Sequence, residues 1–237
     1  MDYADGMRST DIIYDDTDPH SLKNLPQMDV CTEIIAADKL EGYIRSYIIL
    51  PPTVYGIATG PIFEAGISNP HSTQIPILLR ASMDRRRGGM IGMGKNVWPN
   101  VEIHELAELY NILLDSTILH PDSIGHGCQG IYNAVNGEYS SYQLAEGIGQ
   151  ALVDLGYADN PIPLTFSTEE ENKYFGSFAR AFGTNSRCLG TRSKSLGWNP
   201  KLTTEDMLKG IKPEIEALMA TRRIMVPQSG TCLGTPV

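Results

Sequence analysis

The stretch Tyr47-Ile48-Ile49-Leu50-Pro51-Pro52-Thr53-Val54-Tyr55-Gly56 decides the fold. Its first half is the unbroken apolar run that is typical of a strand buried in a parallel sheet. Pro51 and Pro52 should end that strand, because proline has no N–H group for the hydrogen-bond ladder. In open α/β sheets, ligands bind outside the carboxyl ends of the strands. We therefore expect a parallel strand over residues 46–50 and a ligand-binding loop directly after it.

Helical periodicity recurs on both sides of this strand, together with a second short strand at residues 130–134. Apolar residues at helical spacing predict helices at residues 29–41, 75–83, 101–119, 140–155, 167–182 and 203–223. Pro213 should kink or divide the last of these, and the tail 224–237 has no periodicity. The polar, Gly- and Pro-containing segment 56–72 reads as a loop. This alternation of strands and helices predicts an α/β protein.

Two of the helices carry clear start and stop signals. Ser140 with Gln143, and Ser167 with Glu170, have the spacing of capping boxes. Gly156 stands where a helix commonly ends with a left-handed glycine. The later helix should carry an aromatic stripe and end at Gly183; the stripe consists of Tyr174, Phe175, Phe178 and Phe182. A stripe at this spacing is more typical of core packing than of a ligand site.

Two segments near residue 90 raise the question of phosphate binding. The run Asp84-Arg85-Arg86-Arg87-Gly88-Gly89 is either a phosphate clamp or a solvated turn, and the second interpretation is the more common one. The run Gly92-Met93-Gly94-Lys95-Asn96-Val97 lacks the third glycine of a dinucleotide-binding loop. That loop also requires a helix directly after it, whereas Trp98-Pro99-Asn100 follows here. We interpret this second segment as a turn.

Composition and charge exclude several classes of protein. The 237 residues carry 19 basic and 28 acidic side chains, a formal charge of −9, which argues against a protein that binds nucleic acid or an anionic membrane. No apolar run is long enough to span a membrane, and the acidic N-terminus does not resemble a signal peptide. The four cysteines are far apart and no His or Cys spacing indicates a metal site, so we expect free thiols and a cytoplasmic protein.

Several segments, in their order along the chain, resemble one family. They are Ile48–Gly56, Asn96–Ala107, Ile131–Ala134 with Gly137–Ser140, Asn185–Arg187 and Ser195–Pro200. Together they are similar to the C-terminal part of an extended or atypical short-chain dehydrogenase/reductase. More narrowly, they resemble fungal NAD(P)-binding proteins of the epimerase/dehydratase type, often labelled aldehyde-reductase-like. The match covers roughly residues 10–220. It implies an incomplete Rossmann-type parallel sheet with a smaller, helix-rich C-terminal substrate domain.

The resemblance also implies site residues and a cofactor. In the family, the loop after the sixth strand passes the nicotinamide and the substrate. By that resemblance, Pro51, Pro52 and Thr53 would contact NAD or NADP. Tyr55, and from the small domain Asn185 and Arg187, would contact a small carbonyl substrate. Alternatively, the prolines only end a strand, Tyr55 is a core ring with a bonded hydroxyl, and Arg187 forms a surface ion pair.

This sequence departs from the family pattern in three places. Nothing before Asp29 resembles the family's G-x-x-G-x-x-G phosphate loop, and the helix before the Pro51 strand has no Tyr-x-x-x-Lys pair. Where the family favours an Asp to cap the helix of its "V-H-V-x-D-L-A" segment, this chain has His104, a poorer cap. The sequence thus predicts a chain that begins after the family's fifth strand.

Three functions follow from these observations. The first is an NAD(P)-dependent oxidoreductase that acts on a small carbonyl compound. The second is a non-catalytic truncated remnant that self-associates through an exposed sheet edge. The third is a cofactor-free isomerase or cyclase, with Glu33, Asp38 or His104 as the base. We expect residues 1–100 to be the remnant of the cofactor domain, and residues 101–223 to hold the end of the sheet and the small substrate domain.

Overall fold

The apolar run at residue 48 forms strand β2 (Ile48–Leu50), and a second strand, β3 (Thr53–Tyr55), follows after two prolines. The computed structural model describes residues 4–18, 28–39 and 43–225 of the chain. In it β2 pairs in parallel with β6 (Ile131–Asn133), whereas β3 pairs in parallel with β5 (Val97–Glu102). Pro51 and Pro52 therefore stand where the chain passes from one sheet to another, and no ladder hydrogen bond is needed from them. The strand's end before Pro51 is confirmed, but the expectation of a loop directly after it is wrong.

Strand β5 also changes partner at a proline. Its first half, Val97–Pro99, pairs antiparallel with β7 (Glu138–Ser140). Its second half, from Asn100 to Glu102, pairs in parallel with β3. Val101 and Asn100 are fully buried at this junction. β5 is thus the central strand of a three-stranded sheet with the order β3-β5-β7.

Two short parallel pairs fasten distant segments to this framework. β1 (Tyr14–Asp15) pairs with β9 (Cys188–Leu189), and β4 (Gly89–Met90) pairs with β8 (Leu164–Thr165). With the β2–β6 and β3–β5 pairs, they confirm the expected α/β class with small parallel sheets.

The helices occupy most of the predicted positions. Their bounds are α2 (Met28–Asp38), α3 (Pro61–Glu64), α4 (Gln74–Asp84), α5 (Ile103–Leu119), α6 (Ser141–Asp154), α7 (Thr168–Tyr174), α8 (Ala179–Phe182), α9 (Thr191–Ser195) and α10 (Thr204–Met225). Single 3-10 turns lie at Gly127–Gln129 and Gly176–Phe178. Both predicted capping boxes are present, and Gly156 has the expected positive φ of 73°. The last two residues of the helix predicted at 29–41, and the tail beyond residue 225, lie outside the described residues.

Three helix predictions need correction. Residues 101–102 belong to β5, so α5 begins at Ile103 and its N-cap is Glu102, not His104. The aromatic segment is not one helix, because Gly176 at a φ of 55° separates α7 from α8. Pro213 lies inside α10 and does not divide it, and a kink at this residue stays a prediction. The segment 56–72, predicted as a loop, contains the one-turn helix α3.

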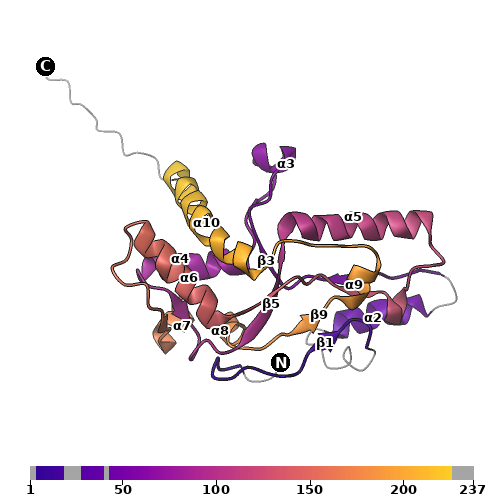
Figure 1. Ribbon diagram of the computed structural model, residues 1–237, viewed down its shortest axis with the longest axis horizontal. Helices are drawn as coiled ribbons and strands as arrows, with labels where there is room; N and C mark the ends of the chain where they lie inside the picture. The colour runs from indigo at the N-terminus through magenta and orange to yellow at the C-terminus, as the bar shows by residue number, and fades with distance from the viewer. Residues whose placement is uncertain (1–3, 19–27, 40–42, 226–237) are drawn as a thin grey trace, which may run out of the picture.

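The core consists of one large and two smaller apolar clusters. The large cluster joins α4, α6, α10 and the aromatic segment, with Leu79, Ile148 and Ile215 at its centre. The smaller clusters lie between β2, β6 and α5, and include Val101, Tyr132 and the fully buried Trp198. In Figure 1, α4, α6 and α10 gather at one end, α5, α9 and α2 lie at the other, and β3 and β5 run between them.

The outer edge of β2 bears on the expected self-association. Among the described residues, β2 has β6 as its strand neighbour and no strand on its other side. An edge of this kind can accept a further strand. Self-association through it stays a prediction, as does the division into domains at residue 100. Within the described part of the chain, no helix combines the length and apolarity that crossing a membrane requires.

Candidate functional site

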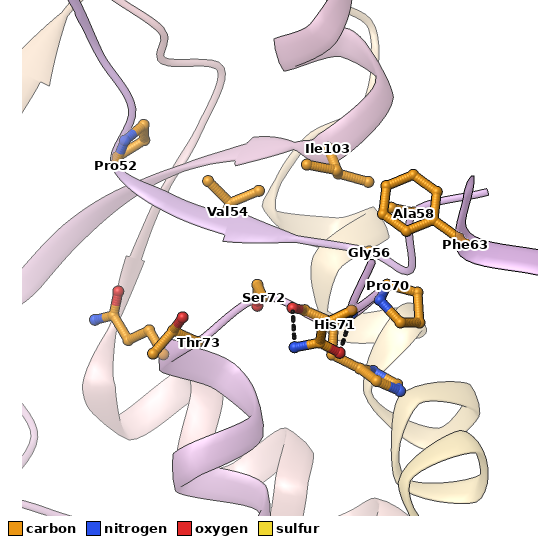
Figure 2. Close-up of a pocket in the computed structure, with 12 residues that line it drawn as sticks. Pro52, Val54, Gly56, Ala58, Phe63, Pro70, His71, Ser72, Thr73 and Ile103 are labelled. Atoms are coloured by element: carbon orange, nitrogen blue, oxygen red, sulfur yellow. Dashed lines mark hydrogen bonds between the residues drawn. The ribbon is translucent and has the colours of Figure 1, made fainter. Parts of the chain in front are cut away.

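A cavity of about 440 Å³ opens where β3 ends. Its walls come from β3, from the following segment that carries α3, and from the first residue of α5. Figure 2 shows Val54 and Ile103 on one side, with His71 and Ser72 opposite them. The cavity therefore lies outside the carboxyl end of a parallel strand, the place where ligands bind in open α/β sheets.

The local sequence explains why the chain opens here. Gly56 follows β3 with a φ of 90°, a conformation that favours glycine. A Cβ on Gly56 would lie 3.0 Å from Glu102 Oε1 at the end of β5, a tight contact that also favours glycine. Asn69 then closes the returning loop, since its side chain accepts from the His71 N–H at 3.2 Å and donates to the His71 carbonyl at 3.1 Å. Figure 2 shows both bonds as dashed lines.

Of the residues expected to contact a cofactor, Pro52 lines the cavity. Pro51 is exposed, and Thr53 is buried in the sheet. The Thr53 hydroxyl lies 2.9 Å from Gln74 Oε1 and 2.8 Å from the Tyr139 hydroxyl, so its hydrogen bonds are made within the protein. Gln74 itself lines the cavity, which places Thr53 directly behind the cavity wall.

The residues expected to contact a substrate do not meet in this cavity. The Tyr55 ring is buried and its hydroxyl donates to the Thr203 carbonyl at 2.9 Å. Burial, with the nearby charges of Asp206 and Glu105, raises the pKa of Tyr55, so its hydroxyl keeps its proton and is a poor acid. Buried Asn185 accepts from the Val97 N–H and donates to the Arg8 carbonyl, and these bonds hold β5 to the N-terminal segment.

Arg187 belongs to a second hollow, of about 460 Å³, between β7, β9 and the start of α10. Its guanidinium donates to both Glu138 carboxylate oxygens at 2.9–3.2 Å and to the Thr10 carbonyl at 3.0 Å. The ion pair with Glu138 raises the pKa of Arg187 further. Each of the three expected substrate residues thus connects distant parts of the chain through hydrogen bonds: Tyr55, Asn185 and Arg187.

Sequence reasoning missed the polar wall of the cavity, which lies in the segment predicted as a plain loop. His71 Nδ1 lies 3.4 Å from Glu214 Oε1 on α10, and both side chains are almost fully buried. Ser72 also lines the cavity, and its shielded Oγ has no hydrogen-bond partner among the described residues. The only sequence signal was the polar run Asn69-Pro70-His71-Ser72 before α4.

Burial raises the pKa of Glu214, against the lowering effect of His71. A carboxyl whose pKa is higher in the folded state stabilises the fold below its unfolded pKa, and this contribution is lost as pH rises through the folded pKa. Glu214→Gln should therefore raise the unfolding temperature at pH 8 by about 2–4 °C, and the gain should shrink towards pH 4.5. Thermal unfolding across that pH range measures both effects.

Glu216→Gln is the matched control for this experiment, because Glu216 is an exposed glutamate on the same helix. It should change the unfolding temperature little at any pH. A Glu214→Gln variant that is less stable than the native chain at pH 8 would contradict the raised pKa.

The three candidate bases lie in different places. Glu33 is exposed on α2. Asp38 accepts from the Ser46 N–H and pairs with His126 Nδ1 at 2.7 Å, and neither Asp38 nor His126 lines the cavity. His104, in the first turn of α5, directly follows the cavity residue Ile103. Of the three, His104 is therefore the one nearest the cavity in the chain.

The described residues do not fit the pyrophosphate of a dinucleotide. The N–H groups of His104 and Glu105 at the start of α5 are bonded by the Glu102 carboxylate, which would repel a phosphate. The start of α6 is closed by its own capping box. In the Gly92–Lys95 turn, a Cβ on Gly92 or Gly94 would strike backbone atoms of Asp5 or Tyr142, so that turn packs against protein.

The arginine-rich segment after α4 forms a turn with Arg86 exposed, as the second interpretation expects, but Arg85 and Arg87 bond to other parts of the protein. Arg85 pairs with Glu170 at 3.2 Å and stacks over the Phe166 ring at 4.7 Å from its centroid. Arg87 donates to the Ile162 carbonyl at 2.5 Å. These bonds attach the segment before α7 to the sheet, so two of the three arginines serve structure and not phosphate binding.

Comparison with known proteins supports the fold alone. No protein-family model matches the sequence, and no curated protein matches it significantly. Solved structures do match, among them UDP-glucose 4-epimerase from Thermotoga maritima with UDP-glucose (TM-score 0.52, 15% identity, 82% of this chain and 52% of that chain). The human epimerase family protein SDR39U1 with NADPH matches with a TM-score of 0.52 and 19% identity, over 86% of this chain and 60% of that chain. UDP-glucuronic acid 4-epimerase from Bacillus cereus with UDP-glucuronic acid and NAD matches with a TM-score of 0.50 and 12% identity, over 79% of this chain and 50% of that chain.

These structures share an epimerase/dehydratase-type fold, and the resemblance to extended short-chain dehydrogenases is confirmed at the level of the fold. This chain spans about half the length of the structures it matches.

Proposed function

We propose that the cavity at the end of β3 binds a small carbonyl compound. On this proposal, the chain is the substrate-binding part of an NAD(P)-dependent oxidoreductase of the epimerase/dehydratase type. The observation that carries the proposal is the position of the cavity, outside the carboxyl end of the parallel β3 strand in this fold. The fold itself and the ligands named with the matching structures support the class.

The lining of the cavity suits a ring or short chain that carries a carbonyl group. Val54, Phe63 and Ile103 form an apolar wall. Ser72 and Gln74 supply the polar side. Gln74 Oε1 is already bonded to Thr53, and among the described residues its amide nitrogen has no partner. A carbonyl oxygen accepts hydrogen bonds, so it could satisfy the Gln74 amide directly, and the Ser72 hydroxyl once that hydroxyl rotates from its shielded position into the cavity.

The chain's own residues would bind and orient the substrate. His71, held by Glu214 of α10 and by the Asn69 side chain, fixes the returning loop against the apolar wall. A positioned carbonyl is the prerequisite for hydride transfer or for proton abstraction next to it. A nicotinamide cofactor would supply the hydride, and its phosphate site is not among the described residues.

Binding of para-fluoroacetophenone, followed by fluorine NMR, tests the proposal. This ketone carries a carbonyl on a ring of suitable size and needs no dinucleotide for detection. Phe63→Ala should weaken binding of the ketone by about tenfold or more, because the aromatic ring of the ketone would no longer pack against the Phe63 ring. Phe63 lies in the one-turn helix α3 and is only partly buried, so the fold should tolerate its loss.

Phe178→Ala is the matched control, since Phe178 is an exposed ring of the neighbouring aromatic cavity, which shares Thr73 and Gln74 with the first cavity but not Phe63. It should leave the affinity unchanged. Weakening by Phe178→Ala and not by Phe63→Ala would move the ligand to the aromatic cavity and overturn the proposed site.

A further inference from the structure

Beside the cavity, three side chains form a hydroxyl–imidazole–carboxylate relay. The Thr59 hydroxyl lies 2.9 Å from His104 Nε2. His104 Nδ1 lies 2.8 Å from Glu102 Oε1, and the Glu102 side chain is 9% exposed. Glu102 also accepts the His104 and Glu105 backbone N–H groups through its other oxygen, which fixes the carboxylate in place.

The hydrogen bonds define the role of each member. A carboxylate can only accept, so His104 Nδ1 carries the hydrogen of the Glu102 bond. In the neutral imidazole, Nε2 is then the acceptor, and it faces the Thr59 O–H. This is the arrangement in which a base activates a hydroxyl nucleophile while a carboxylate orients the base.

Two neighbouring features would serve an acyl substrate. Ala58 and Ile103, the chain neighbours of Thr59 and His104, both line the cavity, so an acyl or aryl group held there lies next to the relay. The backbone N–H of Gly60 directly follows Thr59 and has no hydrogen-bond partner among the described residues. A backbone donor in that position can stabilise the oxyanion of an acyl-transfer intermediate.

We propose that Thr59 is a nucleophile that accepts an acyl group from small activated esters. The Thr59 oxygen attacks the ester carbonyl carbon while His104 Nε2 takes its proton. The bond to the leaving alcohol breaks, and His104 gives the proton to that oxygen, leaving acyl-Thr59. Water then attacks the acyl carbon, His104 takes a proton from the water and returns it to Thr59, and a carboxylic acid is released. Glu102 is the positioning residue.

The test uses para-nitrophenyl acetate as the ester. Nitrophenolate release gives the rate, and peptide mass spectrometry gives the site of the acetyl group. Thr59→Ala and His104→Asn should each lower the rate by about a hundredfold or more, and Thr59→Ser should retain it. Glu102→Gln should lower kcat with little change in KM, a pattern that mere loosening of the helix start would not produce.

His126→Asn is the matched control. His126 Nδ1 pairs with Asp38 at 2.7 Å and is 41% exposed, against 51% for His104, but no hydroxyl bonds its other nitrogen among the described residues. This variant should react like the native chain. Acetyl groups found on lysines alone, or a rate unchanged by Thr59→Ala, would overturn the proposal. Binding of para-fluoroacetophenone to Thr59→Ala should be unchanged, which separates this result from the proposed function.

Discussion

Replacing Gly92 with alanine should destabilise the folded chain by about 3 kcal/mol or more, one of the two largest effects we expect. Gly92 has a φ of 55°, and an added Cβ would lie 2.0 Å from the backbone oxygen of Asp5. The left-handed backbone alone costs an alanine about 1 kcal/mol. The clash adds more, because the atom that must move belongs to the backbone and not to a flexible side chain.

Gly176→Ala isolates the cost of the backbone conformation from that of the clash. Gly176 has the same φ of 55°, but no atom lies within 4 Å of the Cβ that an alanine would place there. This substitution should cost only about 1 kcal/mol. Denaturant unfolding of the two variants measures the difference. Equal costs would mean that the segment around Asp5 does not pack against the Gly92 turn.

The second large effect is expected at Asp16, which follows β1 and is fully buried. Its carboxylate accepts the Asn133 N–H at 2.9 Å and the Arg192 N–H at 2.7 Å, and it lies 3.5 Å from the Ser193 hydroxyl. It thus joins the N-terminal segment to β6 and to the start of α9. Asp16→Ala leaves these donors buried without an acceptor and should cost about 2–4 kcal/mol.

Asp16→Asn should cost less than Asp16→Ala, because the amide keeps one acceptor oxygen and carries no buried charge. Burial raises the pKa of Asp16, so ionisation of this carboxyl group costs more in the folded chain than in the unfolded chain. The contribution of Asp16 to stability therefore falls as the pH rises through the folded pKa. Asp11→Ala, at an exposed aspartate of the same segment, is the control and should be nearly neutral. An Asp16→Ala cost below about 0.5 kcal/mol would show that Asp16 does not join these elements.

The sequence predicted the helices whose signals are local. The capping boxes at Ser140 and Ser167 and the glycine at 156 depend on residues a few positions apart, and the structure has all three. The strand β3 was missed because Pro51 and Pro52 were expected to end a strand. The strand β5, which contains Pro99, was missed because residue 97 was assigned to a turn and residues 101–102 to a helix. In the structure these prolines stand where a strand exchanges one partner for another, which depends on pairing between distant segments.

The site was harder to predict for the same reason. The cavity opens after β3 and not directly after residue 50 as expected, although Pro52 lines it. His71 and Ser72 carry no motif, and His71 gains its setting from Glu214, 143 residues away in the chain. For Arg187, the alternative prediction of an ion pair agrees with the bonds that its guanidinium donates to the Glu138 carboxylate. Ligand contact stays a prediction for all six expected site residues, which are Pro51, Pro52, Thr53, Tyr55, Asn185 and Arg187.

The proposed carbonyl site at the end of β3 is tested directly by a fluorine NMR titration of para-fluoroacetophenone against three proteins: the native chain, Ser72→Ala and Ser82→Ala. Both serines have a buried hydroxyl without a hydrogen-bond partner among the described residues, but Ser72 lines the cavity and Ser82 lies inside α4. We predict binding to the native chain and to Ser82→Ala, and about tenfold weaker binding to Ser72→Ala. Equal affinity for all three, or no binding, would contradict a carbonyl site at the end of β3.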